Sequence, residues 1–212
     1  MDKQFETLLN ALQSCPIVPV LTIDDSEIAA PLARALHAAG LTVIEITLRT
    51  PQALGAIKKM KQAAPSLLVG AGTILTPNDV QASVDAGSDF LVTPAVSSQL
   101  LPAVKATRLP VFPGVATPSE ALEMYTQGFS HVKFFPAEAS GGVRALKAIA
   151  APLPHITFMP TGGINGTNAP DYLALSNVIA VGGSWMIDKH ALALRDFKRI
   201  QDTARQAVTQ LG

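Results

Sequence analysis

One lysine stands in the middle of an apolar, aromatic-rich run. The segment HVKFFPAE, residues 131–138, lies between glycines and predicts a strand. Side chains alternate along a strand, so if Val132 and Phe134 pack outward we expect Lys133 to point inward. Burial favours the neutral form of an amine, and a neutral amine attacks carbonyl carbons to form a Schiff base. The alternative is a structural lysine that pairs with an interior carboxylate or extends to the rim.

The segment EITLRTP, residues 45–51, supplies groups that such chemistry needs. Glu45 and Arg49 share one face of the expected strand, and burying either without a partner is costly. Glu45 is predicted to pair with Lys133 or to act as a general acid and base. The planar guanidinium of Arg49 suits a substrate carboxylate. A purely structural network of the three charges is the alternative.

Two pairs of glycines mark the last two expected strand ends, in PTGGIN (160–165) and VGGSW (181–185). Glycines expose backbone N–H groups that can surround an anion. We therefore predict a phosphate site from both pairs, Gly162-Gly163 and Gly182-Gly183, with Ser184 as a hydroxyl donor and Thr161 one residue before the first pair. No lysine or arginine is adjacent, so backbone dipoles are expected to hold most of the phosphate charge. The alternative is two ordinary turns.

Two further strand ends give weaker signals. GAGTIL (70–75) places Thr73 at a strand end, and TPAV (93–96) places Pro94 at another. Gly, Thr and Pro are common at such ends for conformational reasons alone, so neither segment indicates a site by itself.

The elements that must position these groups alternate along the chain. Strands are expected at residues 17–23, 41–48, 66–74, 89–96, 110–116, 131–137, 156–163 and 178–185, with Ala-rich helical segments between them. Helix starts are expected at Thr50-Pro51, Thr76-Pro77 and Thr117-Pro118, and helix ends at Gly40, Gly87 and Gly128.

Eight such units predict one domain over residues 1–212, a single (β/α)8 TIM barrel with an additional N-terminal helix. The competing fold is an open doubly wound sheet, but no dinucleotide fingerprint follows the first strand. Barrel active sites lie at the C-terminal ends of the strands, where the candidate residues above are expected.

Composition narrows the functional classes. Lys plus Arg and Asp plus Glu both number 16, so no basic field favours a nucleic acid partner. No apolar run approaches a membrane span, and the N-terminal segment is predicted to be an amphipathic helix and not a signal peptide. The single cysteine, Cys15, suits a reducing compartment, and a cytoplasmic location is expected. The four histidines are scattered without metal-binding spacing, so no metal or other cofactor is predicted.

The motifs EITLRTP, GAGTIL, PGVATPSEA, KFFPAE, PTGGI and GGSW, in this order, resemble the 2-keto-3-deoxy-6-phosphogluconate (KDPG) aldolase family, also described as 4-hydroxy-2-oxoglutarate (KHG) aldolase. The resemblance runs from Ile17 to Trp185. It implies a homotrimeric class I aldolase that cleaves KDPG, a keto-acid phosphate, to pyruvate and glyceraldehyde 3-phosphate without a metal.

The resemblance also implies roles for individual residues. Lys133 matches the Schiff-base lysine and Glu45 the general acid and base. The substrate-binding positions match Arg49, Thr73, Pro94 and Thr161, and the phosphate pocket matches Gly162, Gly163 and Ser184. One departure is Ala95, which stands where the family pattern leads us to expect glycine, so the choice of aldehyde is less fixed than the lysine chemistry.

Two other functions fit the same residues. A phosphosugar isomerase would use Glu45 as a base and Lys133 as an electrostatic stabiliser of an enediolate. A non-catalytic binder of phosphorylated ligands would need the glycine turns but not a buried carboxylate.

Overall fold

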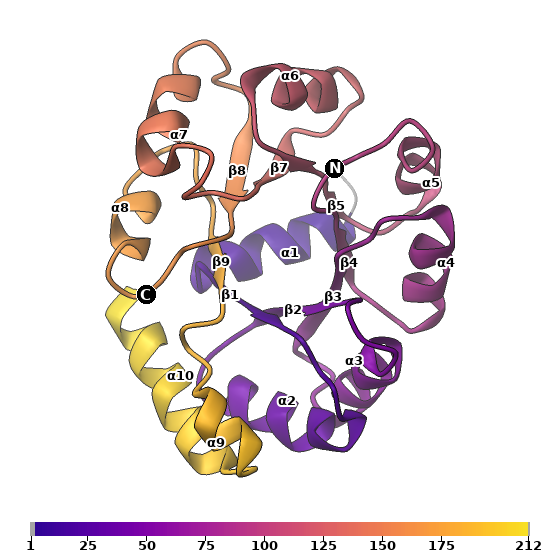
Figure 1. Cartoon of the computed structure of the whole chain (residues 1–212), viewed down its shortest axis with the longest axis vertical. Coiled ribbons are helices and arrows are strands. Elements are labelled where there is room, and N and C mark those ends of the chain that lie inside the picture. The colour runs from indigo at the N-terminus through magenta and orange to yellow at the C-terminus, as the bar shows by residue number, and fades with distance from the viewer. Residues whose placement is uncertain (1–2, 212) are drawn as a thin grey trace.

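The structure is a computed structural model that describes residues 3–211. Helices surround a group of parallel strands (Figure 1). The helices are α1 (Lys3–Ser14), the 3-10 helix η1 (Ser26–Ile28), α2 (Ala29–Ala38), α3 (Ala53–Ala63), α4 (Pro77–Asp85), α5 (Leu101–Ala106), α6 (Pro118–Thr126), α7 (Gly142–Ala150), α8 (Ala169–Leu173), α9 (Lys189–Ala193) and α10 (Phe197–Leu211).

The strands appear where the sequence predicts them, but they are shorter. They are β1 (Ile17–Leu21), β2 (Val43–Thr47), β3 (Leu68–Gly72), β4 (Phe90–Val92), β5 (Val111–Phe112), β6 (Gly114–Val115), β7 (His131–Phe134), β8 (Thr157–Pro160) and β9 (Val181–Gly183). The fifth expected strand is divided in two at Pro113, which has no N–H to donate to a ladder.

The strands form a curled, parallel α/β arrangement in two sheets. Six strands pair in the order β5-β4-β3-β2-β1-β9, and three pair in the order β6-β7-β8. At Pro113 the sheets meet, because its carbonyl oxygen accepts a hydrogen bond of 2.9 Å from the backbone N–H of Lys133. On the other side, isolated parallel bridges join Phe158 to Val178 and Thr161 to Gly182. The strand ends that carry the candidate residues therefore lie on one side of the molecule.

Helix α1 packs its apolar residues against the strands. Leu8 and Leu12 belong to one buried cluster with strand residues that include Val18, Val43 and Phe112. Cys15 follows the helix directly and is buried, and this burial raises the pKa of its thiol.

The predicted helix starts are confirmed in two of three places. Thr76 and Thr117 are N-caps with complete capping boxes, in which Asp79 and Glu120 accept from the cap N–H. The expectation at Thr50-Pro51 is wrong, because α3 begins at Ala53 and the intervening residues form a turn. Instead, the Thr50 hydroxyl donates to the Ile23 carbonyl and fixes this turn to the segment after β1. The glycines expected at helix ends, Gly40, Gly87 and Gly128, all have positive φ.

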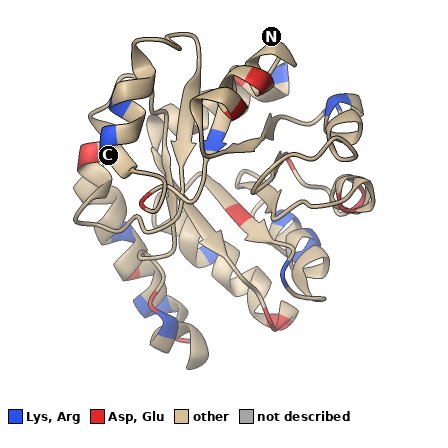
Figure 2. Ribbon diagram, turned by 45° about the horizontal axis from the view of Figure 1, so that its top comes forward, with Lys and Arg blue, Asp and Glu red and all other residues tan. Residues whose placement is uncertain are grey.

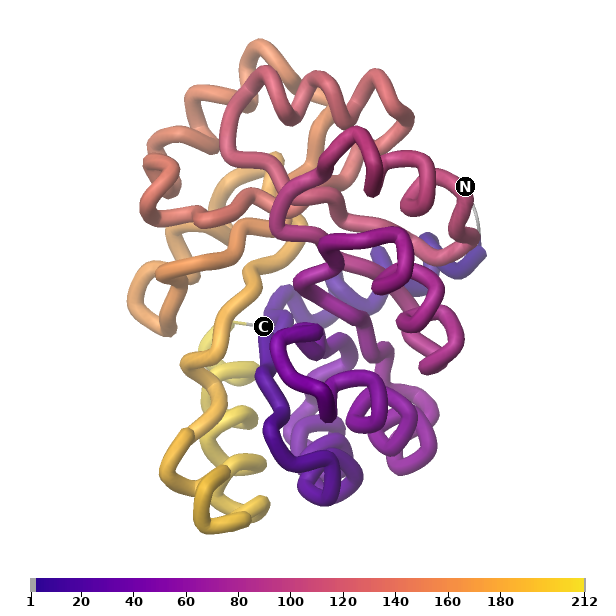
Figure 3. Tube along the Cα trace, turned by 45° about the vertical axis from the view of Figure 1, so that its right-hand side comes forward, coloured from indigo at the N-terminus to yellow at the C-terminus, as the bar shows by residue number. Residues whose placement is uncertain are grey.

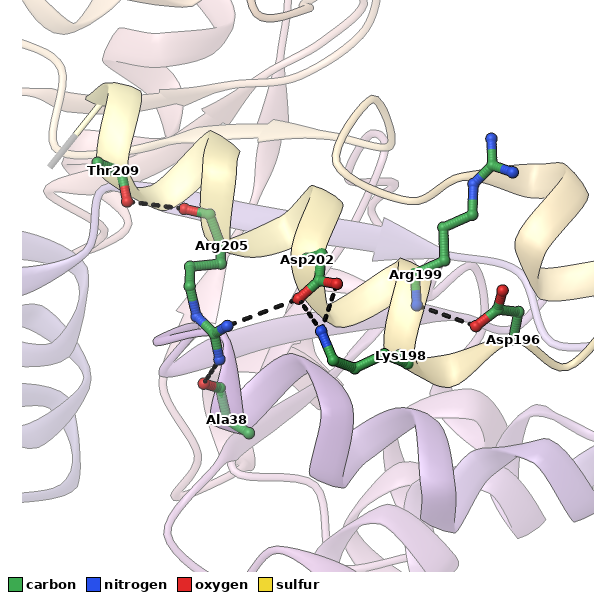
Figure 4. Close-up of polar contacts among 7 residues, drawn as sticks. All are labelled: Ala38, Asp196, Lys198, Arg199, Asp202, Arg205 and Thr209. Atoms are coloured by element: carbon green, nitrogen blue, oxygen red, sulfur yellow. Dashed lines mark hydrogen bonds and ion pairs between the residues drawn. The ribbon is translucent and has the colours of Figure 1, made fainter.

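Near the C-terminal end of the described chain, α10 lies against α2 (Figure 3). Figure 4 shows Arg205 donating to the Ala38 carbonyl at the end of α2, at 3.0 Å, and pairing with Asp202 on its own helix. Charged residues are concentrated on the outer helices (Figure 2). Among residues 3–211, no helix is both long enough and apolar enough to cross a bilayer.

Candidate active site

The lysine and the glutamate predicted to work together do meet. Lys133 projects from β7 and Glu45 from β2, and Lys133 Nζ lies 3.3 Å from Glu45 Oε1. Lys133 is 5% exposed and Glu45 is 0% exposed, so both charged groups are removed from water. The expectation that Lys133 is buried and faces Glu45 is confirmed. A buried pair of this kind holds each group in place only while the other is present.

Glu45 has bonding capacity that the described residues do not use. Its Oε1 contacts Lys133, whereas its buried Oε2 has no hydrogen-bond partner among residues 3–211. A buried acceptor without a partner is unusual and marks a place where a substrate hydroxyl or a water can bind. This oxygen therefore has the capacity to accept a hydrogen bond from a ligand beside Lys133.

The end of β3 is shaped to admit Glu45. A Cβ at Gly72 would lie 2.0 Å from Glu45 Oε1, so only glycine leaves room for the carboxylate. Thr73 follows at once with a φ of 60°, a conformation that β-branched residues rarely adopt. Such strain is often found at binding sites. Thr73 directly follows Gly72, which lies against the Glu45 carboxylate.

A cavity of about 520 Å³ opens at the C-terminal ends of β1, β2, β8 and β9. Phe135 lines it, and the centroid of the Phe135 ring lies 5.2 Å from Lys133 Nζ. Arg49 lines it as well. The prediction that Arg49 shares the buried face of the strand is wrong, because β2 ends at Thr47 and Arg49 lies in the exposed turn that follows. This turn nevertheless brings its guanidinium to the cavity.

The glycine turn after β8 forms another wall of this cavity. Gly162 and Gly163 have φ of 104° and 81°, which only glycine adopts without strain. Thr161 lies beside them, and its buried Oγ1 has no partner among the described residues. A Cβ at Gly182 would lie 2.4 Å from that oxygen, so β9 closes tightly on Thr161.

Glu138 supports the glycine turn from below. Its N–H donates to the Gly162 carbonyl at 3.1 Å, and its Cγ would be 2.6 Å from a Cβ at Gly163. The buried hydroxyl of Tyr172 donates to Glu138 Oε1. Burial and the neighbouring carboxylate raise the pKa of Tyr172, so its hydroxyl keeps the proton that it donates. The sequence analysis did not identify these two residues, although the turn depends on them.

The cavity wall near Ser184 also carries charged side chains that the sequence did not indicate. Ser184 lines the cavity as expected, but so do Lys189 on α9 and Asp24 after β1. A lysine that is not adjacent to the glycines in the sequence therefore lines the same cavity as they do. Lys189 is five positions after Ser184 in the chain, and an intervening turn, in which Ile187 N–H donates to the Ser184 carbonyl, brings it back to the cavity.

Pro94 and Thr73 lie near the Lys133–Glu45 pair. Neither residue lines the wall of this cavity. The backbone of Pro94 lies against Gly114, where a Cβ would be 2.3 Å from the Pro94 carbonyl carbon. Gly114 is in turn the β-ladder partner of Lys133. The exposed Ala95 lines a separate small cavity next to α6. Among residues 3–211, no group of three or more His, Cys, Asp and Glu side chains could hold a metal ion.

Comparisons with known proteins identify relatives along almost the whole chain. The family model "KDPG and KHG aldolase" matches residues 8–203. The KHG/KDPG aldolase of Escherichia coli K12 is 44% identical over 197 residues, which cover 93% of this chain and 92% of the relative. The 2-dehydro-3-deoxy-phosphogluconate aldolase of Dickeya dadantii is 45% identical over 197 residues, with the same coverage of 93% and 92%.

Solved structures agree with the sequence relatives. A KDPG aldolase from Legionella pneumophila, with pyruvate captured as a covalent carbinolamine, superimposes with a TM-score of 0.90 at 40% identity. The match covers 94% of this chain and 97% of that one. A Zymomonas mobilis KDPG aldolase with 3-phosphoglycerate has a TM-score of 0.87 at 40% identity, and covers 94% and 93% of the two chains.

Proposed function

The chain belongs to the KDPG and KHG aldolase family, and we propose that it is a class I aldolase that cleaves KDPG to pyruvate and glyceraldehyde 3-phosphate. The observation that carries this function is the buried Lys133–Glu45 pair beside a cavity with a guanidinium and a glycine turn on its walls. The lysine of the pair matches the ketone of the substrate, the guanidinium matches its carboxylate, and the glycine turn matches its phosphate.

Substrate binding precedes the covalent chemistry. Arg49 binds the carboxylate of the keto acid, with Thr73 and Pro94 bordering the reacting centre and Thr161 donating from its unpaired hydroxyl. The N–H groups of Gly162 and Gly163 and the hydroxyl of Ser184 bind the phosphate. These contacts hold the ketone carbon over Lys133, which removes much of the entropic barrier to attack.

The covalent cycle uses one amine and one carboxyl group. Lys133 Nζ attacks the C2 carbonyl carbon, the oxygen takes up a proton, and the carbinolamine loses water to give an iminium. The C4 hydroxyl then loses its proton, the C3–C4 bond breaks, and its electron pair moves into the iminium to form an enamine. Glyceraldehyde 3-phosphate leaves. Protonation of the methylene carbon and hydrolysis release pyruvate and Lys133, and Glu45 carries protons in these steps.

Borohydride trapping tests the covalent step. Intact protein incubated with pyruvate and borohydride is expected to gain one reduced pyruvyl group, seen by mass spectrometry. Lys133→Met should gain none, and Lys147→Met, which changes an exposed lysine away from the cavity, should gain it as the wild type does. An adduct retained in Lys133→Met would refute the assignment.

We propose cleavage of 4-hydroxy-2-oxoglutarate to pyruvate and glyoxylate as a second activity, because the relative from Escherichia coli is named for both substrates. Pyruvate release measured side by side from the two substrates decides the preference.

The isomerase alternative has no support in the comparisons, since the matched family and relatives are aldolases. A non-catalytic binder would release no pyruvate from either substrate.

We also propose the finer architecture and setting that the resemblance implies. Residues 1–212 would form one domain, a closed (β/α)8 barrel with α1 across one end. The bridges between β8 and β9 and the contact at Pro113 support closure.

A cytoplasmic homotrimer is proposed, and the exposed apolar side chains of Leu122 and Tyr125 on α6 would suit a subunit contact. Light scattering of the purified protein gives the subunit number.

A further inference from the structure

The cavity holds one cation that the proposed catalytic cycle does not use. Lys189, the first residue of α9, is exposed and lines the same cavity as Gly162, Gly163 and Ser184. It lies on the phosphate side, because α9 follows directly from the loop that carries Ser184. Arg49, the other cation on the wall, follows β2, which is separated from β9 by β1.

Lys189 is free to bind a ligand. Across the described part of the chain, 3–211, the side chain of Lys189 makes no hydrogen bond or ion pair. The carboxylate next to it, that of Asp188, is occupied elsewhere. Asp188 Oδ1 accepts from the backbone N–H groups of His190 and Ala191, and its Oδ2 lies 2.7 Å from Arg199 Nε. The adjacent carboxylate of Asp188 therefore does not compete for the ammonium of Lys189.

A phosphate at the glycine turn would need such a cation. The N–H groups of Gly162 and Gly163 and the Ser184 hydroxyl are neutral donors, whereas a phosphate monoester carries up to two negative charges. Asp24 also lines the cavity and adds a negative charge, so the neutral donors alone would have to overcome its repulsion. Hydrogen bonds from an ammonium to phosphate are stronger than those from neutral groups.

We infer that Lys189 is a specificity-determining residue that binds the substrate phosphate and selects phosphorylated over unphosphorylated keto-acid substrates. The inference rests on the proposed function, and it adds a residue that lies outside the sequence motifs. Lys189 acts on binding of the phosphate end of the substrate and not on the amine chemistry at Lys133.

The experiment compares two substrates that differ only in the phosphate, KDPG and 2-dehydro-3-deoxygluconate. Lys189→Met is expected to lower kcat/KM for KDPG by about tenfold, mainly through KM, because one charge-assisted contact is lost. For the unphosphorylated substrate the change should stay below about twofold. Lys189→Arg, which keeps the charge, should restore most of the preference. Lys147→Met is the matched control and should behave as the wild type with both substrates.

A second readout separates this inference from the proposed function. Binding of inorganic phosphate is measured by calorimetry, and Lys189→Met should weaken it whether or not the protein cleaves KDPG. Equal losses for both substrates, or unchanged phosphate binding, would overturn the inference. A wild-type protein that binds phosphate but neither traps pyruvate nor cleaves KDPG would overturn the proposed aldolase function and leave the role of Lys189 in phosphate binding standing.

Discussion

Lys133 and Glu45 form a buried ion pair, to which the proposed function adds a chemical role. Neither group is accessible enough for water to compensate its charge, so each depends on the other. The surrounding strands keep the Lys133 amine out of contact with bulk water.

Removing one member of the pair should destabilise the fold. Glu45→Ala is expected to lower the free energy of unfolding by about 3–5 kcal/mol, because it leaves the Lys133 ammonium buried without a partner. The double variant Glu45→Gln with Lys133→Met, which removes both charges while keeping their volume, should recover a large part of that loss. Urea denaturation followed by circular dichroism measures both, and equal stabilities for the two variants would contradict this account.

Tyr172 acts at the residue scale through Glu138. Tyr172→Phe removes the hydroxyl that holds Glu138 beneath the glycine turn, so the turn should become looser. The expected results are a loss of about 1 kcal/mol in unfolding free energy and a higher KM for KDPG. Trapping of pyruvate at Lys133 should remain, since in the proposed binding mode the turn contacts only the phosphate end of the substrate. An unchanged KM would mean that Gly162 and Gly163 keep their conformation without this support.

Among the helices, the capping boxes are the clearest local determinants of structure. Thr117 accepts from the N–H of Glu120 and so satisfies a helix N-terminal donor of α6. Thr117→Ala should cost about 1 kcal/mol and lower Tm by about 2–4 °C. Ser119→Ala, two positions further along the same helix, is the matched control and should leave Tm unchanged in differential scanning calorimetry.

The elements were predictable where local chemistry decides them. Short apolar, β-rich runs located each strand, and Thr followed by Pro located α4 and α6. The same signal misled at Thr50-Pro51, because the Thr50 hydroxyl is fixed to Ile23, a contact distant in sequence. Lys133 and Glu45 were identified because charge in an apolar strand is conspicuous. Lys189 was not, because an exposed lysine at a helix start has no distinctive pattern until the turn after Ser184 is folded.

At the scale of the whole molecule, His131 links the first helix to the strands. Its ring lies edge-on to two aromatic rings, that of Phe5 on α1 with centroids 5.0 Å apart and that of Phe112 with centroids 6.4 Å apart. Its Nδ1 lies 3.1 Å from the Ser130 hydroxyl. Burial lowers the pKa of His131 below its ordinary value of 6.5, because no carboxylate in these contacts stabilises the charged ring.

The lowered pKa of His131 predicts how stability depends on pH. The unfolded chain binds a proton at this histidine more readily than the folded one, so stability is full above pH 6.5 and falls as the pH drops below it. His131→Leu should reduce that slope in urea denaturation series between neutral and mildly acidic pH. If the slope is the same in the variant, other groups account for it.

The burial of Cys15 at the junction of α1 and β1 gives this molecule an internal reporter. A thiol with a raised pKa and little exposure reacts with an alkylating reagent only after α1 detaches from the strands. The rate of labelling under native conditions therefore measures how often that end of the molecule opens, with no engineered probe. Since the sequence contains no second cysteine, the readout is a single kinetic phase, and it can be followed with and without pyruvate.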